Sequence, residues 1–290
     1  MAPIVLVHGI FNHVRGVTPE TAGLRQAANC LPGLAESLGK LQVQVPELVM
    51  AYYADLLRQE FPAQAQSARN EGDFESLSGR HRVQAAEWLV TAGVPIPEDP
   101  QNVGLAPLRQ MLGWLIDERS RNRLGAAVRE QLIRRLERVI VTNLREVEAY
   151  TSWPERRRLV RDRVAAVIRR EGPAVVIAHS LGSYITYETL HARPELEVQL
   201  LVTVGSPLRI PSLARRLDPG LRAGRGARPA GVERWVNIAD VGDVVAVPPR
   251  LSEMFPVDQD ETCDNGLGFH GFSSYLANGL LAAAIAPYIS

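Results

Sequence analysis

The sequence predicts an α/β protein in which helices cover both faces of a mostly parallel sheet. Short apolar segments, rich in β-branched residues, indicate buried strands at residues 3–7, 48–53, 174–178, 199–204 and 233–238. Segments with helical spacing of apolar residues alternate with them, at residues 22–38, 181–191 and 272–286. A chain of 290 residues is long enough for one such domain with an insertion.

The stretch from residue 56 to residue 171 interrupts this alternation and is predicted to be largely helical. Its clearest helix covers residues 128–150, where apolar side chains recur at three- and four-residue steps. A further helix begins near Ser152 and Glu155, which have the spacing of a capping box, and ends at Gly172. We therefore divide the chain into a core of residues 1–55 and 172–290 and an insertion of residues 56–171, whose last helix we assign to the core.

Composition argues against several classes of function. The chain has 32 basic and 32 acidic side chains and no net formal charge, so it lacks the positive excess with which nucleic-acid-binding proteins attract phosphates. We find no apolar stretch long enough to span a bilayer and no signal peptide at the start. Cys30 and Cys263 resemble neither a disulfide framework nor a metal site. We expect a cytoplasmic protein that has no nucleic-acid partner and no metal.

The strongest chemical signal lies at residues 178–182, which read AHSLG. A buried strand runs directly into a helix there, with Ser180 at the junction. Ala178 and Gly182, two positions on either side, are small enough for a sharp strand–turn–helix elbow. Such an elbow presents the Ser180 hydroxyl above the sheet and leaves the N–H of Leu181 unpaired in the first helical turn. In the alternative interpretation, Ser180 is the N-cap of an ordinary helix.

This segment resembles the nucleophile motif of the α/β-hydrolase family, in particular its lipase-like and esterase-like branches, with Ala178 in place of the first glycine. His8, Gly9 and Ile10 follow the first predicted strand and are similar to the start of that family's oxyanion loop. The resemblance implies that the N–H groups of Ile10 and Leu181 bind the oxyanion and that His8 supports the loop. It also implies a sheet of about six strands, trimmed at its N-terminal side.

In the α/β-hydrolase family the nucleophile is followed along the chain by the acid and then by the histidine. Two histidines follow Ser180, and His191 falls within the helix directly after the motif, so this order implies His270, in a glycine-rich loop, as the base. Asp240 and Asp243 both follow the strand at residues 233–238. Asp243 fits the family's acid better. Asp240 is the alternative, or else caps the turn through its own backbone.

The resemblance implies a serine hydrolase of the esterase or lipase type, which cleaves an acyl ester of a small-molecule or lipid substrate through an acyl-enzyme and needs no cofactor. It also implies a cap formed by the insertion. The cap residues that we expect either to line an acyl site or simply to pack the helices together are Trp88, Leu89, Val90, Leu112, Trp114 and Leu115. Two other hypotheses stay open: a thioesterase or acyltransferase with the same triad, and a catalytically inactive binding module with the hydrolase fold.

Overall fold

The structure is a computed structural model that describes residues 2–57, 73–95, 105–119, 125–266 and 270–289. Its described strands form one six-stranded sheet in which every neighbouring pair is parallel, in the order β2-β1-β3-β4-β5-β6. The strands are β1 (Ile4–Val7), β2 (Leu48–Met50), β3 (Val175–His179), β4 (Val198–Val204), β5 (Val232–Asp240) and β6 (Gln259–Cys263). The predicted α/β class is confirmed.

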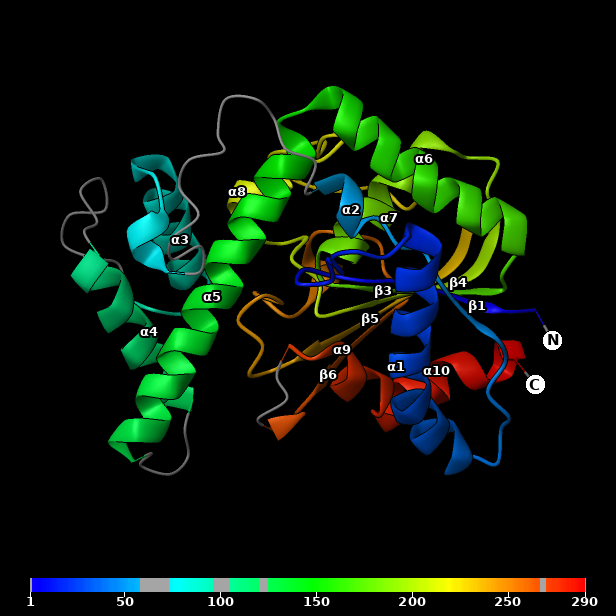
Figure 1. Cartoon of the computed structure of the whole chain (residues 1–290), viewed down its shortest axis with the longest axis horizontal. Helices are drawn as coiled ribbons and strands as arrows, with labels where there is room; N and C mark the ends of the chain where they lie inside the picture. Colours follow the sequence, from blue (N-terminus) through cyan, green and yellow to red (C-terminus); the bar gives the residue numbers. More distant parts are fainter. Residues whose placement is uncertain (1, 58–72, 96–104, 120–124, 267–269, 290) are drawn as a thin grey trace.

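Helices connect these strands and cover both faces of the sheet (Figure 1). The described helices before β3 are α1 (Pro19–Gly39), α2 (Ala54–Leu57), α3 (Gly79–Thr91), α4 (Leu105–Arg119), α5 (Ala126–Thr151) and α6 (Pro154–Glu171). Those after β3 are α7 (Leu181–Ala192), α8 (Pro211–Ala214), α9 (Phe272–Leu276) and α10 (Gly279–Ile289).

Alternate residues of the central strands belong to two separate cores. In β1, Ile4 and Leu6 pack in the core that contains α1, α9 and α10, whereas Val5 and Val7 pack in the core that contains α6 and α7. All four side chains are fully buried. Since successive side chains of a strand point to opposite faces, a strand covered on both faces needs an unbroken apolar run. This requirement explains why the sequence of β1 reads IVLV.

Helices α3, α4 and α5 pack against one another beyond the carboxyl ends of the strands (Figure 1). They come from the stretch of residues 56–171 that we set apart as an insertion. Helix α6, the last helix of that stretch, packs instead against β1 and α7. Gly172 ends α6 with a positive φ of 51°, the left-handed conformation that favours glycine at a helix C-terminus.

Four local predictions need correction. Strand β6 was not predicted, because its sequence QDETC is polar and half-buried, as suits an edge strand with one neighbour. Strand β2 ends at Met50 rather than at residue 53. The expected final helix is two helices, interrupted at Asn278, whose Oδ1 accepts a hydrogen bond from Leu280 N. Ser152 belongs to the end of α5, and Trp153 precedes α6 without a side-chain cap.

Candidate functional site

Ser180 occupies a strained turn between β3 and α7. Its φ of 52° and ψ of −129° lie where a residue with a Cβ atom rarely settles, so surrounding contacts must hold the conformation. Ser180 N donates to Val204 O at 3.0 Å, and Ser183 N donates to Ser180 O at 2.9 Å. The Ser180 side chain makes no capping hydrogen bond to the helix. The N-cap interpretation therefore does not describe this serine, and its hydroxyl is left for other partners.

Two glycines allow the backbone beside β1 to approach the elbow closely. A Cβ atom on Gly182 would lie 2.5 Å from Val7 O and closer still to His8 O, and one on Gly9 would lie 2.6 Å from Ser180 Cβ. These distances are far inside van der Waals contact. The requirement for glycine at position 182 thus comes from the close approach of the end of β1. The same contacts place Gly9 directly beside the serine.

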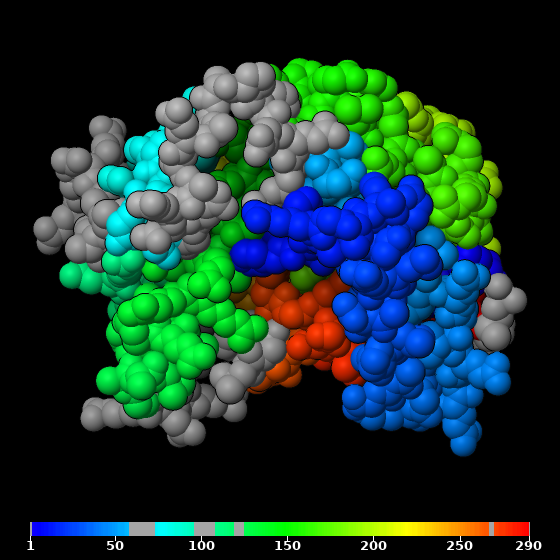
Figure 2. Space-filling view, in the orientation of Figure 1, coloured from blue at the N-terminus to red at the C-terminus, as the bar shows by residue number. Residues whose placement is uncertain are grey.

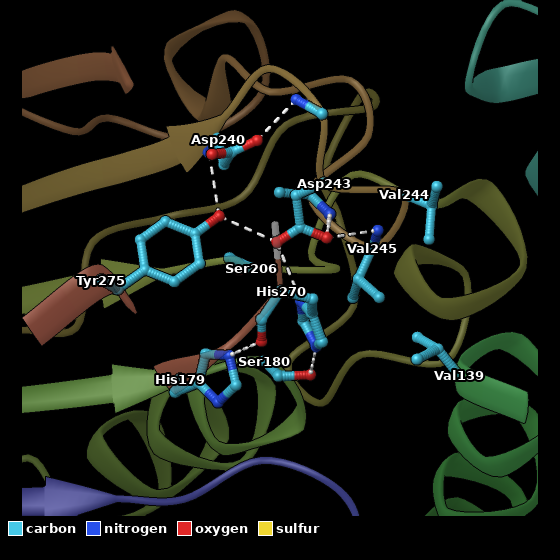
Figure 3. A network of polar contacts seen from close by, with 12 residues as sticks. Val139, His179, Ser180, Ser206, Asp240, Asp243, Val244, Val245, His270 and Tyr275 are labelled. Carbon is cyan, nitrogen blue, oxygen red and sulfur yellow. Dashed lines mark hydrogen bonds and ion pairs between the residues drawn. The ribbon is translucent and has the colours of Figure 1, made fainter. Parts of the chain in front are cut away.

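The structure brings Ser180, His270 and Asp243 together above the carboxyl ends of β3, β4 and β5 (Figure 3). His270 Nε2 lies 2.9 Å from Ser180 Oγ, and His270 Nδ1 lies 2.8 Å from Asp243 Oδ2. Since a carboxylate only accepts, Nδ1 carries a proton and donates it, which leaves Nε2 of the neutral imidazole free to accept from the serine hydroxyl. This is the arrangement in which a histidine acts as a base toward a serine.

Asp243 is held by donors on both of its oxygens. Oδ1 accepts from Val245 N at 2.8 Å and from Ala246 N at 3.4 Å. Oδ2 accepts from the Tyr275 hydroxyl at 2.8 Å as well as from His270. Burial raises the pKa of Tyr275 far above its usual range, with the charge of Asp243 adding to this shift, so the hydroxyl stays protonated and donates. The carboxylate is fully buried and has no freedom to turn away from the histidine.

Asp240, the alternative acid, makes a different set of hydrogen bonds. Oδ1 accepts from Gly242 N at 2.6 Å, and Oδ2 accepts from Asn265 N. Burial raises the pKa of this carboxyl group, although the two backbone donors oppose the shift. Its hydrogen bonds among the described residues run to backbone rather than to a histidine. Asp240 therefore caps the turn, in line with the second role that the sequence left open for it, and Asp243 is the residue beside His270.

Sequence reasoning missed two residues that hold this arrangement, His179 and Tyr275. His179 Nε2 donates to the backbone carbonyl of His270 at 3.0 Å, and its ring stacks on Phe272 with a centroid distance of 4.8 Å. Burial lowers the pKa of His179 well below its ordinary value, so the ring is neutral. Because His179 directly precedes Ser180, its hydrogen bond to the His270 carbonyl connects the strand–turn–helix elbow to the loop that carries His270. The position of His179 inside AHSLG, directly before the serine, is the sequence signal that indicates such a role. Tyr275 offered no signal, because aromatic residues are common in core-facing helices.

The loop after β1 is fixed by side chains around it. His8 Nδ1 donates to Gly9 O at 2.8 Å, while Nε2 accepts from Tyr53 N at 3.1 Å. Asn12 Nδ2 donates to the carbonyl oxygens of Gly9 at 3.0 Å and Ile10 at 2.7 Å. Burial lowers the pKa of His8 to about 4, which suits a neutral ring that both donates and accepts. With these hydrogen bonds His8 supports the loop and does not act as a base.

Leu181, the other residue expected to bind an oxyanion, is the first residue of α7. Its N–H group is therefore one of the helical donors that have no carbonyl partner one turn earlier. Ile10 lies next to Gly9, which contacts Ser180. Both expected donors thus come from segments that adjoin the serine, one from the elbow itself and one from the loop after β1.

The serine is enclosed in this structure, and apolar groups lie near it. Ser180 has no exposed surface, whereas 12% of the His270 side chain is exposed. Val139 of α5 lies on the same side as the serine hydroxyl, with Val244 and Val245 near the carboxylate (Figure 3). On the surface, Figure 2 shows a hollow between α5 in green and the N-terminal segment in blue, with the C-terminal segment in orange and red at its floor. The Ser180 hydroxyl is therefore closed to solvent in this structure.

The apolar residues expected in a cap pack mainly within the core around α3, α4 and α5. Trp88, Leu89, Leu112 and Leu115 are buried, Val90 packs against them, and Trp114 is 38% exposed. Trp88 Nε1 also donates to Val244 O at 2.5 Å, so α3 touches the segment that carries Asp243. Of the two interpretations, packing of the helices describes these residues better than the lining of an acyl site.

Within the described parts of the chain, no cluster of three or more His, Cys, Asp or Glu side chains is arranged to hold a metal ion. None of the described helices combines the length and the apolarity needed to cross a bilayer. Comparisons with protein-family models, with curated proteins and with solved structures find no match to this chain. The case for a function therefore depends on the geometry of the site.

Proposed function

We propose that this protein is a serine hydrolase of the α/β-hydrolase type, in which Ser180 is the nucleophile, His270 the base and Asp243 the acid that orients the base. The observation that carries the proposal is the continuous hydrogen-bonded path from Asp243 Oδ2 through His270 to Ser180 Oγ, with distances of 2.8 and 2.9 Å. The positive φ of Ser180 supports it, because strained backbone persists where a function requires it.

The proposed reaction is the transfer of an acyl group to the serine and then to water. Ser180 Oγ attacks the acyl carbon while His270 Nε2 takes the hydroxyl proton. The bond to the leaving alcohol breaks, and the alcohol receives that proton from His270. Water then attacks the acyl-enzyme with His270 again as base, which releases the acid and restores Ser180. Asp243 stabilises the imidazolium formed in each step.

The backbone N–H groups of Leu181 and Ile10 are proposed to bind the oxyanion of the tetrahedral intermediates. The glycine contacts between the loop after β1 and the elbow support this role, since they bring the segments of Ile10 and Leu181 together at the serine. Loss of one such donor costs about 3 kcal/mol of transition-state stabilisation in serine hydrolases. Because both donors are backbone groups, this part of the site depends on loop geometry rather than on side-chain identity.

We propose an acyl ester of a small molecule or lipid as the substrate. Val139, Val244 and Val245 support an apolar acyl group beside the serine (Figure 3). We further propose that the protein works in the cytoplasm. Cys30 and Cys263 are both free, which suits a reducing compartment, where disulfides are rare.

The test is covalent labelling with a fluorophosphonate, followed by peptide mass spectrometry. The wild-type protein should gain one adduct on Ser180, the Ser180→Ala variant none, and His270→Ala should label far more slowly. Ser252→Ala, at an exposed serine in a short 3-10 helix between β5 and β6, serves as the control and should label like the wild type. An absence of labelling in the folded wild type would favour the inactive binding module and contradict the proposal.

A substrate panel separates the hydrolysis of esters from the alternatives that share the triad. We expect turnover of p-nitrophenyl esters to exceed that of acyl thioesters with the same acyl chain, and to be lost in Ser180→Ala. Preference for thioesters would indicate a thioesterase, and products formed on an added alcohol instead of water would indicate an acyltransferase.

A further inference from the structure

A cavity of about 520 Å³ lies between the first turns of α3, the junction of α5 and α6, and the segment around α8. Its lining residues all carry hydrogen-bond donors: Arg80, Gln84, Thr151, Ser152, Arg157, Ser212, Arg215 and Arg216. None of these lining residues is acidic, and none is apolar. Because small-molecule sites are usually lined mainly by apolar side chains, such a lining points to a highly polar ligand that accepts hydrogen bonds.

We propose that this cavity binds a phosphate monoester dianion. Two of its four guanidinium groups are neutralised within the protein, Arg157 by Glu188 and Arg215 by Glu87, the latter at 2.9 Å. No described carboxylate pairs with Arg80 or Arg216. Four positive charges less two negative ones leave a local charge of +2. A phosphate monoester near neutral pH carries a charge of about −1.5 to −2, which matches this excess.

Neighbouring groups hold the central guanidinium groups in place. Arg216 Nη1 donates to Thr151 Oγ1 at 3.3 Å, and Arg157 Nη2 donates to the backbone carbonyl of Arg216 at 2.7 Å. The buried Glu188 also accepts from Asp218 N at 3.0 Å, which ties the segment after α8 to α7. Arg157 donates with Nε and Nη2 to Glu188 and to the Arg216 carbonyl, which leaves its Nη1 for a phosphate oxygen. Arg216 donates only with Nη1 among the described contacts, so its Nε and Nη2 can make a pair of hydrogen bonds to phosphate with little loss of side-chain freedom.

Ser212 gives an independent reason to expect a ligand. It lines the cavity and is only 3% exposed, yet its Oγ has no hydrogen-bond partner among the described residues. A buried hydroxyl without a partner is unfavourable and uncommon in folded proteins. The hydroxyl is closed to solvent in this structure, and a bound phosphate oxygen would supply the missing partner once the Ser212 side chain turns toward the cavity. The Ser212→Ala change removes no described hydrogen bond of the free protein, and it therefore isolates a loss of ligand binding from a loss of stability.

The experiment is a calorimetric titration of the full chain with inorganic phosphate and with glycerol 3-phosphate, beside sedimentation with phosphatidylcholine vesicles that contain or lack phosphatidic acid. We expect saturable binding at millimolar phosphate or below. Affinity should fall at least about tenfold in Arg216→Gln and in Arg80→Gln, the effect of losing one charge-assisted hydrogen bond. Ser212→Ala should also weaken binding, with an unchanged melting temperature. Arg25→Gln, at an exposed position of α1 outside the cavity, is the matched control.

The two arms distinguish the sources of the phosphate group. Binding of glycerol 3-phosphate in solution indicates a free phosphorylated metabolite, whereas binding only to vesicles that contain phosphatidic acid indicates a lipid headgroup. The proposal is overturned if no probe binds saturably, or if Arg216→Gln and Arg80→Gln bind as the wild type and Arg25→Gln do. This proposal does not depend on the proposed hydrolytic activity, because none of the lining residues belongs to the triad or to the oxyanion loop.

Discussion

The Tyr275 hydroxyl bridges two aspartates: it donates to Asp243 Oδ2 at 2.8 Å and accepts from the backbone nitrogen of Asp240 at 2.8 Å (Figure 3). One phenol in α9 thus fixes the end of β5 and the carboxylate that faces His270. Since Tyr275 is fully buried, water does not replace its hydroxyl easily. Tyr275 is therefore a positioning residue for the proposed reaction, acting through Asp243.

The Tyr275→Phe variant is expected to lose catalytic rate rather than substrate affinity. It leaves the backbone N–H of Asp240 buried without an acceptor, at a cost of about 1–3 kcal/mol, and frees Asp243 on one side. We expect kcat for ester hydrolysis to fall about tenfold while KM stays within about twofold, because only the imidazolium formed in the transition state needs the fixed carboxylate. Tyr288→Phe is the control. Full activity in Tyr275→Phe, which keeps the ring and loses only the hydroxyl, would mean that Tyr275 acts only by packing.

Substitution at the two aspartates separates catalysis from stability. Asp243→Asn should lower kcat by about 10⁴, because an amide no longer selects the required tautomer of His270. Asp240→Asn should retain most of the activity but melt at a lower temperature, since Asp240 accepts hydrogen bonds from the backbone of Gly242 and Asn265. Steady-state kinetics and thermal unfolding of both variants check this. The opposite pattern would make Asp240 the acid.

Gly182→Ala should disrupt the elbow. The added methyl group would meet the carbonyl oxygens of His8 and Val7, the latter at 2.5 Å, so either β1 or α7 has to shift, at an expected cost of more than about 2 kcal/mol. Gly39→Ala, at the end of α1, is the matched control, because a methyl group there meets nothing within 4 Å. Chemical denaturation measures the free energy of unfolding of both variants. A Gly182→Ala protein as stable as the control would contradict the close approach.

Ser180→Gly and Ser180→Ala should differ in stability although both are inactive. The φ of 52° at this position strains any residue with a Cβ atom but suits glycine. We expect Ser180→Gly to be more stable than Ser180→Ala by about 1 kcal/mol, in spite of the greater freedom of glycine in the unfolded chain. Denaturant titration of the two variants tests this. A more stable alanine variant would show that the turn carries no strain.

Acidification should destabilise the protein through His8 and His179. Burial lowers the folded-state pKa of His8 from 6.5 to about 4 and that of His179 well below 6.5. Between about pH 4 and pH 6.5 the unfolded chain therefore binds more protons than the folded protein, so the stability that is complete above pH 6.5 is lost as the pH falls. The raised pKa of Asp240 acts in the opposite direction, but only near the range where carboxylates titrate.

The measurement is the free energy of unfolding in urea at several pH values through this window. A tenfold difference in proton affinity between the folded and unfolded states corresponds to about 1.4 kcal/mol, so the decline from these two buried histidines should be readily detected. A free energy of unfolding that stays level through the window would mean that both imidazoles are protonated in the folded protein.

Local patterns predict the buried strands, whereas the close approach of the three residues was implied by the resemblance to the α/β-hydrolase family. Strand β3 is an unbroken apolar run up to His179, and the order of Ser180, Asp243 and His270 along the chain singled out the histidine and narrowed the acid to two neighbours. The choice between Asp240 and Asp243 needed coordinates. The two residues follow the same strand and lie three positions apart, and the sequence does not show which carboxylate faces His270.

Long-range contacts were beyond prediction for a physical reason. Tyr275 reaches Asp243 across 32 residues, and the arginines around the α8 cavity come from separate segments, none of which carries a local pattern that indicates its neighbours. The sequence does not predict β6 for another reason. A half-buried polar edge strand lacks the apolar pattern that indicates the other strands.

The place of β1 in the sheet has a consequence for synthesis. It lies between β2 and β3, and Ile4 pairs with Val175, so β1 leaves the ribosome long before its second neighbour exists. Until β3 has been synthesised, one apolar edge of β1 has no strand to pair with in the nascent chain. Pairing with the wrong chain then competes with folding. The yield of the protein in a cell should thus depend on chaperone supply more strongly than its final stability suggests.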